Sequence, residues 1–272
     1  MIHKAKKSLG LKNQYIFARA KKALGQNFLK SEIALRQIIE AGEIKENDVI
    51  LEIGPGKGAL TEKLLEKARV VIAVEKDYEL FGFLKVKFGK EIKEKKLILM
   101  QDDILEFDTT ILPAYKIIAN IPYNITGAIL KKFLTAKKQP EMMVLMVQHE
   151  VATRILARDG KESILSISVK AYGEPKMIAK VDKRYFSPAP NVNSAIISIK
   201  NISRKIFEEN KISEERFWEI VKAGFAHKRK KLSSNLKDVC QRDSLTEWGN
   251  KRAEDLGLKD WISITKEAMN QS

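Results

Sequence analysis

The chain has 272 residues, 44% hydrophobic and 31% charged, which is enough for one large globular domain or two unequal ones with a real core. Lys and Arg number 50 against 35 Asp and Glu, and the resulting formal charge of +15 favours a polyanionic partner such as nucleic acid. One cysteine excludes an internal disulfide, and with only three histidines we expect no metal site. Apolar runs are too short to cross a bilayer and no secretory signal is visible, so we expect a cytoplasmic protein that does not bind membranes.

The segment before Glu32 contains no acidic side chain. A block of this kind usually stays solvated and often serves as an arm that binds nucleic acid. We therefore predict a flexible basic arm over residues 1–22, and we expect Lys21 and Lys22 to contact RNA. The eight cations of the segment are Lys4, Lys6, Lys7, Lys12, Arg19, Lys21, Lys22 and Lys30.

From Ser31 the pattern becomes helical, with Ser31 as N-cap and with Ile33, Ile38 and Ile39 on one face. Beyond this helix, short apolar runs alternate with helical stretches. Such alternation predicts βαβ units and a parallel sheet that is covered on both faces. The expected strands are Val49–Ile53, Val70–Val74, Leu97–Met100, Lys116–Ala119 and Met143–Val147, with helices such as Ala59–Lys67 and Gly127–Ala136 between them.

Past residue 175 the pattern changes, and strands over Met177–Val181 and Ala195–Ile199 flank a proline-rich loop. After residue 203 the sequence is charged and helical. Helices are expected at Ser213–Ala226, Leu232–Val239, Ser244–Leu256 and Trp261–Met269. We therefore predict three parts in chain order: the arm of residues 1–22, an α/β domain over residues 23–202, and a small helical domain over residues 203–272.

A glycine-rich turn follows the first predicted strand, with glycines at positions 54, 56 and 58. Glycines let a backbone turn sharply and approach a ligand closely, and Glu75, 21 residues after Gly54, can accept hydrogen bonds from ribose hydroxyls. The pattern also fits a dinucleotide fingerprint, so NAD is an alternative. Glu52, suited to orient the turn and a methionine amine, favours S-adenosylmethionine (SAM). So does Asp103, which can bond an adenine amine while Ile104 packs on the ring.

The segment after the fourth predicted strand, residues 120–123, is the most informative. Asn120 can accept a hydrogen bond from an exocyclic adenine amine through its side-chain oxygen, and Ile121 can do so through its backbone carbonyl. Pro122 fixes the turn and supplies no donor, and Tyr123 can stack on a flipped base. Two acceptors would draw the amine nitrogen toward a tetrahedral geometry, with its lone pair aimed at a methyl group. No general base is needed, because the product cation can lose its proton to water.

Together these motifs resemble the bacterial-type small-subunit (16S) rRNA adenine N6,N6-dimethyltransferase family, whose loss gives kasugamycin resistance. The resemblance covers roughly residues 20–237. The motifs that carry it, in order, are residues 24–29, 52–61, 74–77, Asp103, 120–123, 186–190 and 194–197. It implies a Rossmann-like SAM-dependent methyltransferase domain with a mostly parallel seven-stranded sheet, followed by a small all-helical domain.

The resemblance also implies an enzyme that dimethylates two adjacent adenines in the 3′-terminal hairpin loop of 16S rRNA. Its partner would be an immature 30S subunit, and we expect a monomer. The target base would lie against Asn120, Ile121, Pro122 and Tyr123, with Phe186 as a second aromatic wall. The cofactor would be held by Asn27, Leu29, Glu52, Gly54, Gly56, Glu75, Lys76, Asp103, Ile104 and Asn120.

A basic helical segment near the C-terminal side packs Lys228, Arg229, Lys230 and Lys231 into four consecutive positions. These side chains cannot share one helix face, so some point to solvent. Members of the family carry a similar segment, which favours contact with RNA phosphates, a contact that adds affinity without base specificity.

Three other functions remain open at this stage. A related adenine methyltransferase of the erythromycin-resistance kind, which acts on large-subunit rRNA, shares the loop after the fourth strand. A non-enzymatic RNA-binding or assembly factor could keep the same fold, although intact Asn120 and Glu75 argue against lost chemistry. An NAD-dependent oxidoreductase is disfavoured, because no residues suited to hydride transfer are evident.

Overall fold

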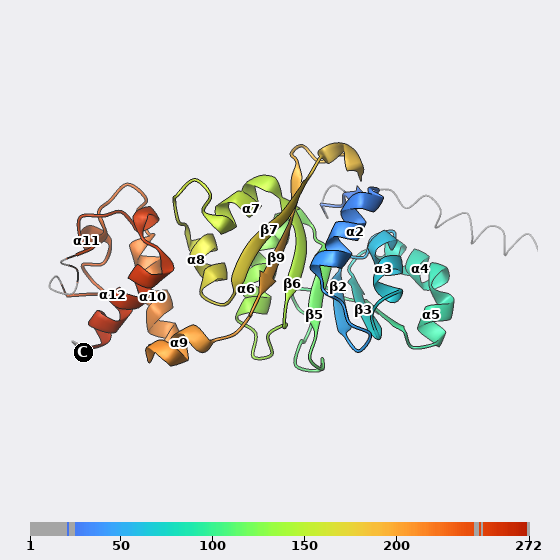
Figure 1. Ribbon diagram of the computed structural model, residues 1–272, viewed down its shortest axis with the longest axis horizontal. Coiled ribbons are helices and arrows are strands. Elements are labelled where there is room, and N and C mark those ends of the chain that lie inside the picture. Colours follow the sequence, from blue (N-terminus) through green and yellow to red (C-terminus); the bar gives the residue numbers. More distant parts are fainter. Residues whose placement is uncertain (1–20, 22–24, 242–244, 246, 271–272) are drawn as a thin grey trace, which may run out of the picture. The chain divides into compact units, whose positions relative to one another are not determined.

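The computed structural model describes residues 21, 25–241, 245 and 247–270 (Figure 1). The described chain divides into two compact units. One holds the described residues up to His149 together with Met177–Ser198, and the other holds Glu150–Lys176 and the described residues from Ile199 onward. The predicted boundary at 202/203 stays a prediction. Sequence analysis did not group 150–176 with the C-terminal part. The predicted arm, apart from Lys21, lies outside the described residues.

The first unit is built on a seven-stranded sheet with the order β4-β3-β2-β5-β6-β9-β7 (Figure 1). The pairs β2–β3, β3–β4, β2–β5 and β5–β6 are all parallel, so the prediction of a mostly parallel sheet is confirmed. A separate two-stranded antiparallel pair joins β1 (Phe28–Leu29) to β8 (Phe186–Ser187). The strands of the large sheet are β2 (Val49–Ile53), β3 (Val70–Glu75), β4 (Leu97–Gln101), β5 (Lys116–Asn120), β6 (Met143–Gln148), β7 (Glu174–Val181) and β9 (Ser194–Lys200).

The burial of the strands explains why this sheet forms, and their order indicates where it can bind a ligand. Every residue of β2 is buried, as in a parallel strand with both faces covered. Leu35 and Ile38 of α2 and Leu60 and Leu64 of α3 belong to the core that packs against the strands. The order of strands reverses between β2 and β5, and open α/β sheets bind ligands at the carboxyl ends of the strands beside such a switch point.

Local signals set the helices of the first unit. The Ser31 side chain accepts a hydrogen bond from Ala34 N and caps α2, as predicted. The predicted face was wrong in one position, because Ile33 is 67% exposed while Ala34, Leu35 and Ile38 are buried. The helices are α2 (Glu32–Ala41), α3 (Ala59–Leu65), α4 (Tyr78–Lys87), α5 (Gly89–Lys93) and α6 (Thr126–Leu134), with single 3-10 turns at η2 (Tyr123–Ile125) and η3 (Lys183–Tyr185).

The second unit is helical, as expected for the C-terminal part. Two expected helices differ from the structure. The one at Leu232–Val239 ends at Asn235, and within Ser244–Leu256 the described residues form turns, including the 3-10 turn Ala253–Asp255, and no α-helix. No described helix is long and apolar enough to cross a membrane. The elements are α7 (His149–Leu156, whose first residue belongs to the first unit), α8 (Ile164–Lys170), α9 (Lys205–Asn210), α10 (Glu214–Gly224), α11 (Leu232–Asn235), η5 (Ala253–Asp255) and α12 (Leu258–Asn270).

Candidate functional site

A cleft of about 230 Å³ lies in the first unit, where β2, β3 and β5 end. The loops that follow these strands supply most of its wall, together with residues 25–29. Ile121, Pro122 and Tyr123 line it, whereas Phe186 does not. All ten residues expected to hold the cofactor line the cleft: Asn27, Leu29, Glu52, Gly54, Gly56, Glu75, Lys76, Asp103, Ile104 and Asn120.

The glycine turn connects β2 to α3 and forms one wall of the cleft. Gly54 and Gly56 have φ values of +63° and +59°, a left-handed conformation that glycine adopts without strain. The turn is also held from outside, because Lys87 Nζ donates to the carbonyl of Lys57 over 2.8 Å while its charge lies over the Phe88 ring. Lys87 could not be found from the sequence, since a lysine in the last turn of a helix carries no distinctive signal.

Two buried carboxyl groups face the turn. Glu75, at the end of β3, accepts hydrogen bonds from Gly56 N at 3.1 Å and Asp77 N at 2.9 Å, one on each oxygen. Glu52 of β2 accepts from Thr61 Oγ1 at 2.7 Å. Burial raises the pKa of both groups, that of Glu52 to about 8. Glu52 is therefore mainly protonated at neutral pH in the ligand-free protein.

Asp103 follows β4 and has a different environment. Its carboxylate accepts from Lys76 Nζ at 2.7 Å and from Leu105 N at 3.0 Å. The hydrogen bond from Lys76 lowers the pKa of Asp103. Asp103 is thus a fixed anionic acceptor at the rim of the cleft, and Ile104 beside it is buried.

The loop after β5 brings Asn120 to the cleft in one orientation. Asn120 Nδ2 donates to the backbone carbonyl of Asn27 at 3.1 Å. Because the amide nitrogen is used in this way, Asn120 Oδ1 is the atom that remains as an acceptor for a ligand. An acceptor therefore stands at the carboxyl end of a central strand, between the glycine turn and Tyr123.

The two aromatic residues predicted to hold a base are placed differently. Tyr123 lines the cleft, and its hydroxyl is hydrogen-bonded to Ser194 Oγ of β9. Burial raises the pKa of Tyr123 to about 12, so its hydroxyl stays neutral. Phe186 is only 2% exposed and belongs to the hydrophobic core, opposite Leu29 in the pairing of β1 with β8. Asn120 and Tyr123 therefore line the cleft, whereas Phe186 is buried in the core and does not line it.

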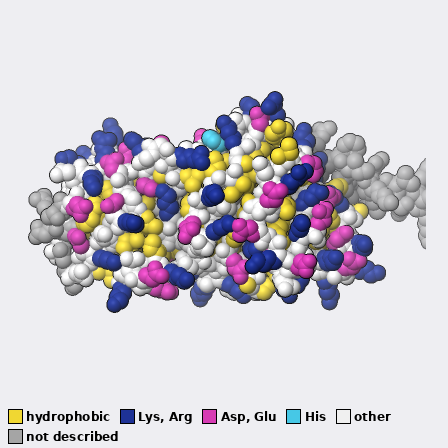
Figure 2. Space-filling model, viewed as in Figure 1, with side chains coloured by type: hydrophobic (Ala, Val, Ile, Leu, Met, Phe, Trp, Pro, Cys, Tyr) yellow, Lys and Arg dark blue, Asp and Glu magenta, His cyan; other side chains and the backbone are white. Residues whose placement is uncertain are grey.

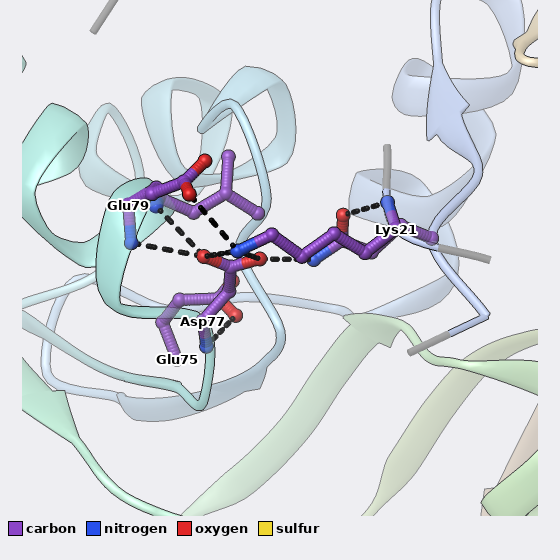
Figure 3. A network of polar contacts seen from close by, with 6 residues as sticks. Lys21, Glu75, Asp77 and Glu79 are labelled. Atoms are coloured by element: carbon purple, nitrogen blue, oxygen red, sulfur yellow. Dashed lines mark hydrogen bonds and ion pairs between the residues drawn. The ribbon is translucent and has the colours of Figure 1, made fainter. Parts of the chain in front are cut away.

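The cations expected to contact RNA fall into two groups. Lys21 forms ion pairs with Asp77 at 3.1 Å and Glu79 at 3.3 Å, and Lys22 lies outside the described residues (Figure 3). Lys228–Lys231 are exposed, but they lie in a turn between α10 and α11 and not in the expected helix. On the face drawn in Figure 2, Lys and Arg side chains are scattered among Asp and Glu and do not gather in one patch.

Two residues near the cleft, Asp77 and Gln26, lie in motifs that carry the family resemblance, but the sequence alone assigned them no role. Asp77 caps α4 by accepting from Glu79 N and Leu80 N, and it also binds the side chain of Gln26 (Figure 3). An Asp directly before a helix is a recognisable N-cap signal that could have been found. Gln26 offers no such signal, because its partner lies 51 residues away.

Comparison with known proteins adds to this geometry. The family described as Ribosomal RNA adenine dimethylase matches residues 17–271. A Ribosomal RNA small subunit methyltransferase A from Fusobacterium nucleatum is 40% identical over 90% of this chain and 96% of its own length. One from Crocosphaera subtropica is 38% identical over 90% and 97%.

Two solved structures have a similar fold over most of the chain. A dimethyladenosine transferase from Plasmodium falciparum gives a TM-score of 0.76 at 27% identity, covering 90% of this chain and 98% of that one. The 23S rRNA methyltransferase ErmE gives a TM-score of 0.72 at 25% identity, covering 89% and 100%.

Proposed function

The chain belongs to the ribosomal RNA adenine dimethylase family and is a methyltransferase, and from this premise we propose its substrate and mechanism. It transfers methyl groups from SAM to the exocyclic N6 of two adjacent adenines in the 3′-terminal hairpin loop of 16S rRNA. Its substrate is an immature 30S subunit in the cytoplasm, on which it acts as a monomer. The observation that carries the proposal is the orientation of Asn120, whose acceptor atom is fixed beside the cleft.

The donor set of the cleft fits SAM. A carboxylate has about four lone-pair directions, and the backbone occupies two on Glu75, which leaves acceptors for both ribose hydroxyls. Asp103 can accept from the adenine amine while Ile104 packs on the ring. Glu52 lies deep in the cleft and suits the methionine ammonium group. Bound SAM supplies an electrophilic methyl group on a sulfonium centre.

The chain's own part in the reaction is to orient the target amine. In the first transfer to each adenine, Asn120 Oδ1 and the carbonyl of Ile121 each accept one N6 hydrogen, which turns the nitrogen lone pair toward the methyl carbon; in the second transfer the one remaining hydrogen binds one of these acceptors. Such fixed acceptors act most strongly in a site from which water is excluded. Tyr123 does not serve as a base, because its pKa is raised to about 12 by burial and its hydroxyl is bound to Ser194. The proton is lost to water after transfer.

A flipped base requires an aromatic surface. Tyr123 offers one in the cleft, and Phe186 is proposed as the second wall. Since Phe186 is buried in the ligand-free protein, this role needs a shift of the β1–β8 pair that exposes its ring.

The decisive experiment supplies labelled SAM together with one of two RNA substrates, immature small subunits or naked 23S rRNA. After digestion, the modified nucleosides are identified and mapped. We expect N6,N6-dimethyladenosine at two adjacent positions near the 3′ end of 16S rRNA. Methylation of 23S rRNA alone would replace the proposal with large-subunit methylation, and SAM binding without methyl transfer to either RNA would favour an assembly factor.

RNA docking is proposed to use the cations of the basic arm and of Lys228–Lys231. Neutralising phosphates releases counterions, so deleting residues 1–20 should flatten the slope of log affinity against log salt by roughly three units if three cations bind phosphates. Neutralising Lys228–Lys231 should weaken the complex without changing the adenine that is methylated. Filter binding over a salt series measures both effects, and an unchanged slope in the truncated protein would remove the arm from the interface.

A further inference from the structure

Residues 25–29, here called the strap, line the cleft. They contact both the cofactor half of the cleft, formed by the loops after β2, β3 and β4, and the adenine half, formed by residues 120–123. Resting on the proposed function, we infer that Gln26 is a positioning residue: by anchoring the strap to Asp77, it fixes the Asn27 carbonyl that orients Asn120 toward the target amine. Gln26 needs no contact with the reacting atoms for this role. The inference depends on three consecutive contacts.

The first contact anchors the strap beside the cofactor half. Gln26 Nε2 donates to Asp77 Oδ2 over 3.0 Å, and Gln26 Oε1 accepts from the backbone N of Lys21 over 2.8 Å. Asp77 is itself rigid, because it is 3% exposed, caps α4, and donates its own backbone N–H to Glu75. The anchor is therefore two residues from the carboxylate proposed to hold the ribose.

The second contact reaches the adenine half. The carbonyl of Asn27, the next residue along the strap, accepts from Asn120 Nδ2 over 3.1 Å. An amide side chain can be rotated by half a turn, which exchanges its oxygen and nitrogen. A carbonyl at this place favours the orientation with the nitrogen toward the strap, and so presents the oxygen to the cleft.

The third contact fixes the other end of the strap, at Phe28 and Leu29. Phe28 and Leu29 pair with Ser187 and Phe186, and the backbone N of Lys30 donates to the carbonyl of Tyr185 over 2.8 Å. Between the two ends, Asn27 Nδ2 donates to the carbonyl of Gly25 over 3.1 Å, which shapes the turn. The Phe28–Leu29 end of the strap is held by its pairing with β8. Loss of the hydrogen bond from Gln26 to Asp77 therefore frees the end that carries the Asn27 carbonyl.

The test starts with Gln26→Ala, compared with Gln37→Ala, a matched control on α2 outside the cleft lining. We expect Gln26→Ala to lower kcat for adenine methylation about ten-fold, because the Asn27 carbonyl no longer holds Asn120 in the productive orientation. The melting temperature should stay close to that of the wild type, and Gln37→Ala should retain full activity. If kcat of Gln26→Ala stays within about two-fold of the wild type, the inference is wrong.

A double-mutant cycle separates positioning from general loosening of the fold. If Gln26 acts through Asn120, Gln26→Ala should change the residual kcat of Asn120→Ala by less than about two-fold, since the group that it orients is already gone. An undiminished ten-fold loss in that background would show that Gln26 acts by another route. The wild-type protein in the same assay distinguishes a failure of the proposed function from a failure of the inference about Gln26. If the wild type does not methylate rRNA adenine, the proposed function itself is wrong.

An exchange of donor and acceptor provides a rescue. Gln26→Glu alone places a carboxylate against that of Asp77 and should lower kcat at least as much as Gln26→Ala. Asp77→Asn keeps an N-cap for α4 and supplies an amide donor. The double variant Gln26→Glu with Asp77→Asn restores the bond with its direction reversed, so kcat should recover toward the wild type. A double variant no better than Gln26→Glu would contradict the anchor.

Discussion

The two halves of the cleft are held in different ways. On the cofactor half, contacts join residues of one βα unit or of the next unit along the chain: Thr61 binds Glu52 from nine residues away, Gly56 binds Glu75 from 19, and Lys76 binds Asp103 from 27. On the adenine half, Asn120 depends on a carbonyl 93 residues away, and Tyr123 on a hydroxyl 71 residues away. The cofactor half is therefore built from βα units that follow one another in the chain, whereas the adenine half is assembled only when distant segments meet.

The difference indicates how each half responds to change. A site built from consecutive βα units keeps its geometry whenever those units fold. An assembled site can lose its geometry while the fold persists, because each member is held by a partner on another segment. Variants on the adenine half should therefore reduce transfer and spare SAM affinity, and variants on the cofactor half should do the reverse.

The largest effect is expected from Asn120→Ala. It removes one of two acceptors for the target amine, and loss of one preorganised polar contact costs about 100-fold or more in kcat. SAM affinity, measured by calorimetry, should fall much less than kcat, because the other nine residues expected to hold the cofactor are unchanged. Turnover close to that of the wild type would refute the proposed role of Asn120.

Glu75→Ala tests the opposite half. The ribose hydroxyls lose a charged acceptor, and hydrogen bonds to charged groups are worth roughly 1.5–3 kcal/mol, so SAM should bind about 10- to 100-fold more weakly. At saturating SAM, kcat should fall much less than it does for Asn120→Ala. Calorimetry that shows tight NAD binding and no SAM binding would reverse the cofactor assignment.

The same difference explains what the sequence could predict. The glycine turn, Glu75 and Asp103 each stand at the end of a predicted strand, and strand ends of a parallel sheet meet at one edge. Their convergence on one cleft was therefore predictable from spacing alone. The Asn27–Asn120 hydrogen bond and the burial of Phe186 could not be predicted in this way. Each depends on the pairing of segments that are distant in the sequence, and such pairing produces no periodic pattern of residues. The basic segment Lys228–Lys231, which lies between the helices expected at Ser213–Ala226 and Leu232–Val239, was described as helical because Lys and Arg have good helix propensity and give no turn signal.

A smaller effect is expected from the aromatic residues. Stacking is worth about 1–3 kcal/mol per base, so Tyr123→Ala should lower methylation efficiency about ten-fold and Tyr123→Phe should retain most of it. Phe186→Ala would also leave a cavity in the core, at about 3–5 kcal/mol of stability. Phe186→Leu is the cleaner variant, because it preserves apolar volume and removes the π-face. A silent Phe186→Leu beside an impaired Tyr123→Ala would show that the second wall is elsewhere.

The last effect concerns the pH dependence of SAM binding. In the ligand-free protein burial raises the pKa of Glu52 to about 8, so the folded state holds a proton that the unfolded chain releases near its ordinary pKa of about 4.3. A raised carboxyl pKa contributes stability below that ordinary value, and the contribution is lost as pH rises through about 8.

A cationic methionine amine placed beside Glu52 favours the carboxylate and lowers this pKa, so binding expels the proton. SAM affinity should therefore rise about 20-fold between about pH 6 and about pH 7.5, with close to one proton released per SAM bound. Calorimetry in two buffers of different ionisation enthalpy counts that proton. Glu52→Gln, which preserves the shape of the side chain and cannot titrate, should abolish both the proton release and the rise. If the wild type binds SAM with no proton release, Glu52 does not face the ammonium group, and the cofactor half depends on Glu75 and Asp103 alone.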